Sequence, residues 1–269
     1  MRAFRHITAW LFALLPGVAQ PQEFTSIKIT TARSTEARDA QWHVFGNGDF
    51  TATGVPVIRL LSYAYDLPVN PSPRLSALPE WILREKYDIQ AKAPVGVAES
   101  ELRSRNRQMV RALLEDRFKL VMRVDKKTIP SYALTVASEG PRLQKSGVRE
   151  RDCGSITEGE PCHAFRNGLG HPLIARAIDM DDLARYLENW TDLPVVNLTG
   201  ITGLYTTNTE GWMPMRLPPP PPNAAPAANP FAGLPTIFTV LGTLGLELKR
   251  EEHVIPFYTV ERIERTAMN

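Results

Sequence analysis

The chain has 269 residues, of which 43% are hydrophobic and 22% are charged, and its formal net charge at pH 7 is +2. This is the composition of a globular protein, and the length suffices for two domains of about 100 residues each. A charge so close to balance gives no reason to expect nucleic acid or an anionic membrane surface as a partner.

The first residues have the pattern of an export signal. Arg2 and Arg5 precede the apolar run Ile7–Leu15, which is too short to span a bilayer. Gly17–Ala19 then offers small residues of the kind that a signal peptidase recognises. We therefore predict a cleaved signal peptide over residues 1–19, an exported chain in the periplasm or outside the cell, and no membrane span after cleavage. A retained anchor and a frayed amphipathic N-terminus are the alternatives.

The first part of the mature chain alternates strand and helix patterns. Pro56 suits the first turn of a helix, and Gly46–Asp49 has the residues of a turn. Hydrophobic periodicity predicts, in chain order, a strand at Phe24–Thr31, a strand at Phe50–Thr53, a helix from Pro56, a strand at Tyr87–Ala91, a helix from Ser100 and a strand pair within Arg117–Val136.

The second part repeats this order in a shorter form after a polar segment, residues 139–168, which is expected to be a linker. The predicted elements are a strand at Leu173–Ile178, a helix capped by Asp179, strands at Val195–Val196 and Gly203–Thr209, a helix at Thr236–Leu244 and a final strand pair. A Pro-rich insertion at residues 217–235 is expected to be an extended spacer, although it also has the composition of a ligand for a partner domain.

Two stretches that lie 126 residues apart resemble each other. Leu244–Val260 repeats Arg117–Val136, with Pro256 in the place of Pro130 and Tyr258 in the place of Tyr132. Each copy has the pattern of a strand, a charged turn, an Ile-Pro pair and a second strand. The repeat predicts an α+β fold with an internal duplication, in which two related units (residues 24–138 and 169–265) each pack two helices on small mixed β-sheets.

The two cysteines lie in a polar segment that contains glycine. In an oxidising compartment, a disulfide between Cys153 and Cys162 is the first expectation, and free thiols are the alternative. Two cysteines with the nearby His163 are too few for a structural zinc site. We expect no cofactor and no metal.

Two groups of residues are candidates for binding. Arg103, Arg107 and Arg111 lie on the predicted helix after Ser100 and suit an acidic partner or lipid head groups, although such charge runs are usually a solvated face. Trp81, Tyr87 and Asp88 combine aromatic rings with a carboxylate, as at the rim of a sugar or peptide groove. The alternative for this second group is that its aromatic residues fill the core.

The sequence contains no HExxH, GxSxG or Walker pattern that would indicate a catalytic site. Asp179, Asp181 and Asp182 with His171 have the atoms needed to ligate a metal. The preferred interpretation is that these carboxylates offset the exposed amides in the first turn of a helix.

Several stretches together resemble a known family. They are Phe50–Leu67, Leu78–Ala93, Met109–Leu143, Asp179–Tyr205 and Leu244–Arg265. The family consists of exported proteins of unknown function, of the acidobacterial type, and is expanded in soil bacteria. This chain departs from its usual pattern at Thr206, where an acidic residue normally follows the tyrosine, and at Asn197–Leu198, where Asp-Lys is common. Each half also resembles, more distantly, the short N-terminal domain of secretins and TonB-dependent receptors, which docks other proteins.

These patterns lead us to expect an exported, non-catalytic binding module of the cell envelope. It would dock a protein or peptide through sheet edges or a helix face. The alternative is a secreted hydrolase with a site between the two units, near Trp81, Tyr87, Asp88 and His171. Converging titratable groups in a polar cleft would favour the hydrolase, and open strand edges would favour the binding module.

Overall fold

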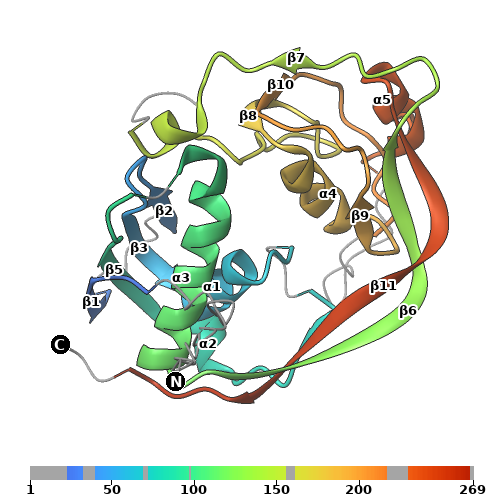
Figure 1. The fold of residues 1–269 in the computed structure, drawn as a ribbon. Helices are drawn as coiled ribbons and strands as arrows, with labels where there is room; N and C mark the ends of the chain where they lie inside the picture. Colours follow the sequence, from blue (N-terminus) through green and yellow to red (C-terminus); the bar gives the residue numbers. More distant parts are fainter. Residues whose placement is uncertain are drawn as a thin grey trace, which may run out of the picture.

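The computed structural model describes residues 23–32, 40–68, 72–96, 98–155, 161–216 and 230–266. Within these ranges, five α-helices pack on several small sheets, so the predicted α+β class is confirmed (Figure 1). The predicted signal peptide at residues 1–19 and residues 217–229 of the Pro-rich insertion lie outside the described residues. None of the described helices combines the length and the apolar character that crossing a bilayer requires.

The first sheet is antiparallel, with the strand order β1-β5-β3-β2. Its strands are β1 (Ser26–Thr31), β2 (Gln41–Val44), β3 (Phe50–Pro56) and β5 (Lys86–Lys92). Successive residues of a strand point to opposite faces, and on β5 this leaves Tyr87 and Ile89 buried but Gln90 and Lys92 exposed. The sheet therefore has one face in the core and one polar face in solvent.

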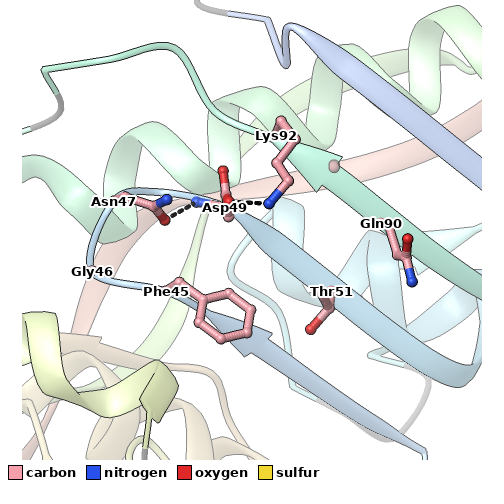
Figure 2. Close-up of a pocket in the computed structure, with 8 residues that line it drawn as sticks. Phe45, Gly46, Asn47, Asp49, Thr51, Gln90 and Lys92 are labelled. Carbon is pink, nitrogen blue, oxygen red and sulfur yellow. Dashed lines mark hydrogen bonds and ion pairs between the residues drawn. The ribbon is translucent and has the colours of Figure 1, made fainter.

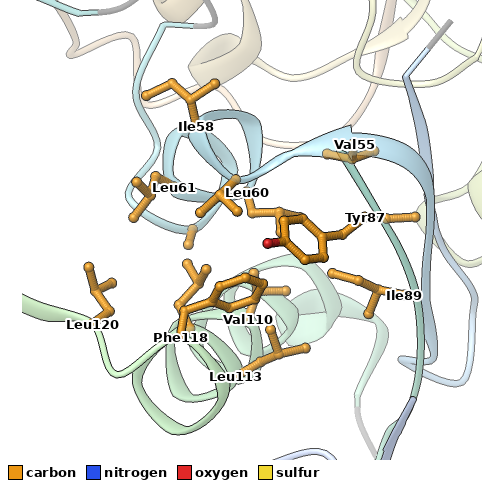
Figure 3. Packing of buried hydrophobic residues seen from close by; sticks show 14 of the residues in the cluster. Val55, Ile58, Leu60, Leu61, Tyr87, Ile89, Val110, Leu113, Phe118 and Leu120 are labelled. Carbon is orange, nitrogen blue, oxygen red and sulfur yellow. The ribbon is translucent and has the colours of Figure 1, made fainter. Parts of the chain in front are cut away.

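Helices α1 (Val57–Ala64), α2 (Trp81–Arg84) and α3 (Leu102–Arg117) form the first hydrophobic core with this sheet, and the short 3₁₀ helix η1 (Glu99–Glu101) leads into α3. Figure 3 shows how side chains from α1, α3 and the sheet interlock. The ring of Tyr87 meets Phe118 edge-on, with 5.2 Å between ring centroids.

The second core forms around a smaller sheet with the order β7-β10-β8. Its elements are β7 (Gln144–Lys145), β8 (Ala175–Ile178), β10 (Tyr205–Thr207), α4 (Met180–Glu188) and α5 (Ile237–Thr243). The predicted cap of α4 is confirmed: the Asp179 carboxylate accepts a hydrogen bond from Asp182 N (2.7 Å), and the Asp182 carboxylate accepts one from Asp179 N (3.0 Å).

Two long antiparallel strands, β6 (Val121–Val136) and β11 (Leu246–Arg262), connect the two cores; we call this pair the ribbon (Figure 1). Met122 and Val260 at one end pack in the first core, whereas Leu134 and Leu248 at the other end are buried in the second. The short strands β4 (Leu75–Ser76) and β9 (Val195–Asn197) add in parallel to β11 and β6, giving the order β4-β11-β6-β9.

The prediction of a strand, a turn and a second strand within each of the repeated stretches was wrong. Each stretch is a single strand, and the charged residues 125–127 face residues 255–257 of the other strand instead of turning. The physical reason is that residues 121–129 contain no glycine or asparagine to adopt a positive φ, and exposed charged side chains are compatible with a solvated two-stranded ribbon.

The predicted disulfide is confirmed, since Cys153 is bonded to Cys162. Cys153 lies in the 3₁₀ helix η2 (Glu150–Ser155), which packs directly on β2. The approach is so close that a Cβ atom added to Gly154 would lie 2.2 Å from the carbonyl oxygen of Val44. The segment after the ribbon is therefore attached to the first sheet.

Candidate functional site

Eight charged side chains from five segments of the chain meet between α3 and α4, and we call them the charge network. They are Asp66, Arg103, Arg107, Glu150, His163, Asp179, Asp182 and Arg185. The segments are the turn after α1, helix α3, η2, the segment after the disulfide, and α4 with its N-cap. The network therefore joins the parts of the chain that carry the first core to those that carry the second.

Asp182 is the centre of the network. Its side chain is 1% exposed and accepts hydrogen bonds from both Arg103 and Arg185. Its Oδ2 atom lies 2.7 Å from Nδ1 of His163 and also accepts the backbone N–H of Asp179. A buried carboxylate is stable only with such partners, because ionised groups lose their hydration on burial.

The remaining members complete a neutral set. Asp66 pairs with Arg107 (2.7 Å) and with Arg185, and Nε2 of His163 lies 3.0 Å from Glu150 Oε1. With His163 protonated, four cations face four anions. Charge balance thus predicts that the imidazole keeps its proton at neutral pH.

The electrostatics of the two central groups agree with this balance. Burial alone would lower the pKa of His163, but the adjacent Asp182 carboxylate raises it to about 9. Burial alone would raise the pKa of Asp182, but Arg103 and His163 hold it well below its usual value. Both groups are therefore charged across the physiological pH range.

His163 should make the protein less stable at high pH. A group whose pKa is raised on folding stabilises the folded state below its unfolded pKa of 6.5 and loses that contribution as the pH rises through about 9. We expect the free energy of unfolding in urea to fall by about 3 kcal/mol between about pH 6 and about pH 9.5. In a His163→Gln variant this part of the decrease should disappear; an identical pH dependence in the two proteins would contradict the assignment.

The network offers little chemistry beyond this connection. His163, Asp179 and Asp182 lie close enough to share a metal ion, but the Arg103 guanidinium already binds both carboxylates. A second group, Glu150, Cys153 and His163, includes a sulfur that is in the disulfide and is not a thiolate ligand. The arrangement is that of a buried ionic connection between two parts of a fold.

The candidate arginines on α3 all contact groups of this chain. Arg103 and Arg107 belong to the charge network, and each side chain is 14% exposed. Arg111 donates to the carbonyl oxygen of Ala64 (2.6 Å) and lies over the ring of Tyr65 at 4.8 Å. Binding of an outside ligand by these arginines stays a prediction, and it would require them to give up internal partners.

The second candidate group is divided between two faces of the first sheet. Tyr87 is buried in the first core with 2% exposure, and Trp81 packs against that core beneath the guanidinium of Arg265. Asp88, the next residue on β5, accepts the N–H of Gly54 at 2.7 Å. Because neighbouring residues of a strand alternate in direction, Tyr87 and Asp88 do not line a common groove.

His171 lies beside the second core. Its ring stacks on Trp190, which packs against that core, with 3.5 Å between centroids, and burial lowers its pKa. His171 and the Trp81 group thus contact different cores, and His171 is not a member of the charge network.

Two further buried pairs were missed in the sequence. Glu188 is 3% exposed and accepts two hydrogen bonds of 2.8 Å from Arg74, which lies just before β4. On the ribbon, Ser131 Oγ lies 2.8 Å from Nδ1 of His253, but Ser131 is 0% exposed and has no access to a substrate. Of the buried charged groups, only Asp182 and Glu188 could have been found from the sequence, because they flank the apolar face of the predicted helix.

By its fold, the protein is an α+β protein with one disulfide between described residues and with two hydrophobic cores, which the ribbon and the charge network join. It belongs to the family described as Protein of unknown function (DUF3738), whose model matches residues 58–263. No curated protein matches the chain, and no solved structure does either.

Proposed function

We propose that this protein is an exported, non-catalytic binding module of the cell envelope that docks a protein or peptide through the strand edges of the ribbon. The observation that carries the proposal is the length of the ribbon compared with its neighbours. Within the described residues, β9 pairs only with residues 132–134 of β6, and β4 pairs only with residues 258–259 of β11. Most of each outer edge is therefore open to another strand.

The direction of the backbone groups supports this use. The N–H groups of Tyr132 and Tyr258 point outward from the ribbon, since they donate to Pro194 O (2.8 Å) and Arg74 O (2.7 Å). Alternate residues of a strand share this direction, so Thr128 and Val254 present outward N–H and C=O groups as well. Val254 is 61% exposed, so an incoming strand would reach this edge.

The prolines of the ribbon limit where a partner strand can add. Pro130 and Pro256 occupy the same outward series, where the missing N–H costs no bond within the ribbon. They lie next to the positions covered by β9 and β4 and separate these from the open stretches 122–128 and 248–254. A docking strand is expected on these open stretches.

The test is capture of a partner from envelope extract by wild-type chain and by a Thr128→Pro, Val254→Pro double variant. The double variant should keep its fold, because it removes only outward N–H groups, and should lose the partner. Hydrogen exchange in the complex should protect amides within residues 122–128 or 248–254. Capture that survives the double substitution, or protection confined to other segments, would refute docking at the ribbon.

A matched control tests the edge assignment itself. Lys127→Pro removes an N–H that faces β11 and with it a hydrogen bond of the ribbon, so it should lower the free energy of unfolding by about 1–3 kcal/mol. Thr128→Pro, one residue away, removes an outward N–H and should lower the free energy of unfolding clearly less than Lys127→Pro does.

Export and internal duplication are parts of the same proposal. The basic and apolar N-terminal pattern and the disulfide support passage to an oxidising compartment. Duplication is supported by the equivalent pairing of two residues 126 positions apart: Tyr132 pairs in parallel with Val195, and Tyr258 pairs in parallel with Leu75. The hydrolase alternative gains no support, because Tyr87 is buried in the first core and Asp88, which lies on the other face of the sheet, is bonded to the backbone of Gly54.

A further inference from the structure

The solvent face of the first sheet carries a row of polar residues that crosses all four strands. His43 of β2 faces Thr51 of β3, Thr51 faces Gln90 of β5, and Gln90 faces Lys28 of β1. This face lies opposite the core, and neither the ribbon nor the charge network contributes to it.

One end of this face is hollowed. A depression of about 480 Å³ is lined by Phe45, Gly46, Asn47, Asp49, Thr51, Gln90, Ala91 and Lys92 (Figure 2). Figure 2 shows Thr51 between the ring of Phe45 and the side chain of Gln90, with the turn at residues 46–49 closing the side next to Phe45. Ligand sites of proteins are commonly of this size.

The turn that closes the depression is held in place. Asn106, which is 0% exposed, donates from α3 to the carbonyl oxygen of Gly48 (2.9 Å). The Asp49 carboxylate accepts the N–H of Ala93 (2.9 Å) and the ammonium of Lys92 (2.7 Å). Gly48 has φ +89°, which suits glycine. A site fixed in this way loses little entropy when a ligand binds.

Several polar groups that line the depression are free to bind a ligand. Within the described residues, the hydroxyl of Thr51, the amide of Gln90 and the amide nitrogen of Asn47 make no hydrogen bond to protein groups. The charged pair Asp49–Lys92, by contrast, is already neutralised. The depression therefore offers neutral donors and acceptors next to an aromatic ring, and no net charge.

We propose that this depression is a binding site for a neutral carbohydrate chain. A sugar ring presents apolar C–H groups to an aromatic face and hydroxyl groups at its edge, which match Phe45 and the amide and hydroxyl side chains. An anionic ligand would need a free cation among the residues that line the depression; Lys92 is the cation among them and is paired with Asp49, while Lys28 lies beyond Gln90, outside the lining. The site is independent of the ribbon edges, so it adds a second binding surface to the proposed function.

The experiment uses neutral hexasaccharides of β-1,4-linked glucose, xylose, mannose and N-acetylglucosamine, and hexagalacturonate as the anionic counterpart. Binding to the full chain is measured by calorimetry and mapped by amide chemical shifts. At least one neutral hexasaccharide should bind and shift amides at residues 45–51 and 90–92. Phe45→Ala and Gln90→Ala should each weaken binding about tenfold, as expected for loss of stacking or of a bidentate amide.

A matched pair of variants on β3 separates binding from folding. Thr51→Val removes a hydroxyl in the depression and should weaken binding, whereas Thr53→Val removes one outside it and should leave binding unchanged. The Thr128→Pro, Val254→Pro variant should bind the saccharide normally, which distinguishes this site from the ribbon. The proposal is overturned if no neutral hexasaccharide binds, if only hexagalacturonate binds, if the shifts map elsewhere, or if both threonine variants behave alike.

Discussion

Replacing Asp182 by alanine is expected to lower the free energy of unfolding by about 3–5 kcal/mol, as measured by urea unfolding. The substitution removes the carboxylate that Arg103, Arg185 and His163 share, and it leaves these cations buried with too few anions. It also removes one half of the capping box of α4. Breaking a buried ion pair from one side costs more than the pair itself contributes, because the remaining charge loses its compensation.

Asp181→Ala is the matched control for this prediction. Asp181 is in the same turn of α4, but it is exposed, and within the described residues its side chain accepts one hydrogen bond, from the amide of Asn197 (2.7 Å). Its replacement should change stability by about 0.5 kcal/mol or less. A loss below about 1 kcal/mol for Asp182→Ala would mean that the charge network does not couple the two cores.

The local patterns of the sequence were sufficient for many elements of the fold. The helix predicted from Pro56 begins one residue later, at Val57, with Pro56 as its N-cap, and the helix predicted after the cap Asp179 begins at Met180. Both helices have a strong apolar face, and both follow a residue that suits a helix start, Pro56 or Asp179. Periodicity and capping therefore indicate the same starting point. The short elements α2, β4 and β7 were missed, because stretches of two to four residues carry too little periodicity.

The ribbon could not be predicted from local patterns, because its pairing is not local. Val121–Val136 and Leu246–Arg262 are far apart in the chain, and each stabilises the extended form of the other. The two copies were recognised as similar, but similarity does not show that copies pair with one another. A charged segment such as Asp125–Lys127 has the composition of a turn until a partner strand is present.

The charge network was hidden for a related reason. A sequence shows that Arg103 and Arg107 are on one helix, but not that an acidic helix start comes to lie against them. The arginines were therefore interpreted as an exposed face for an outside anion, while the anions that they contact belong to α4 with its N-cap and to the turn after α1. Their partner was within the chain, 76 residues away in the case of Asp179.

Tyr87→Ala is expected to lower the free energy of unfolding by about 3–5 kcal/mol, because it leaves a cavity in the first core where the ring meets Phe118. Tyr87→Phe should lower the free energy of unfolding by less than about 1 kcal/mol, since within the described residues the hydroxyl donates one long hydrogen bond, to Glu85 at 3.3 Å.

The same pair of variants separates a core residue from a binding residue. If Tyr87 lined a groove, the phenylalanine variant would keep its stability and lose a partner or saccharide that the wild type binds. Burial predicts the opposite order: the alanine variant is unstable, and the phenylalanine variant binds like the wild type. Urea unfolding and hexasaccharide calorimetry on both variants decide between these outcomes, and a stable Tyr87→Ala variant would contradict the placement of this ring in the core.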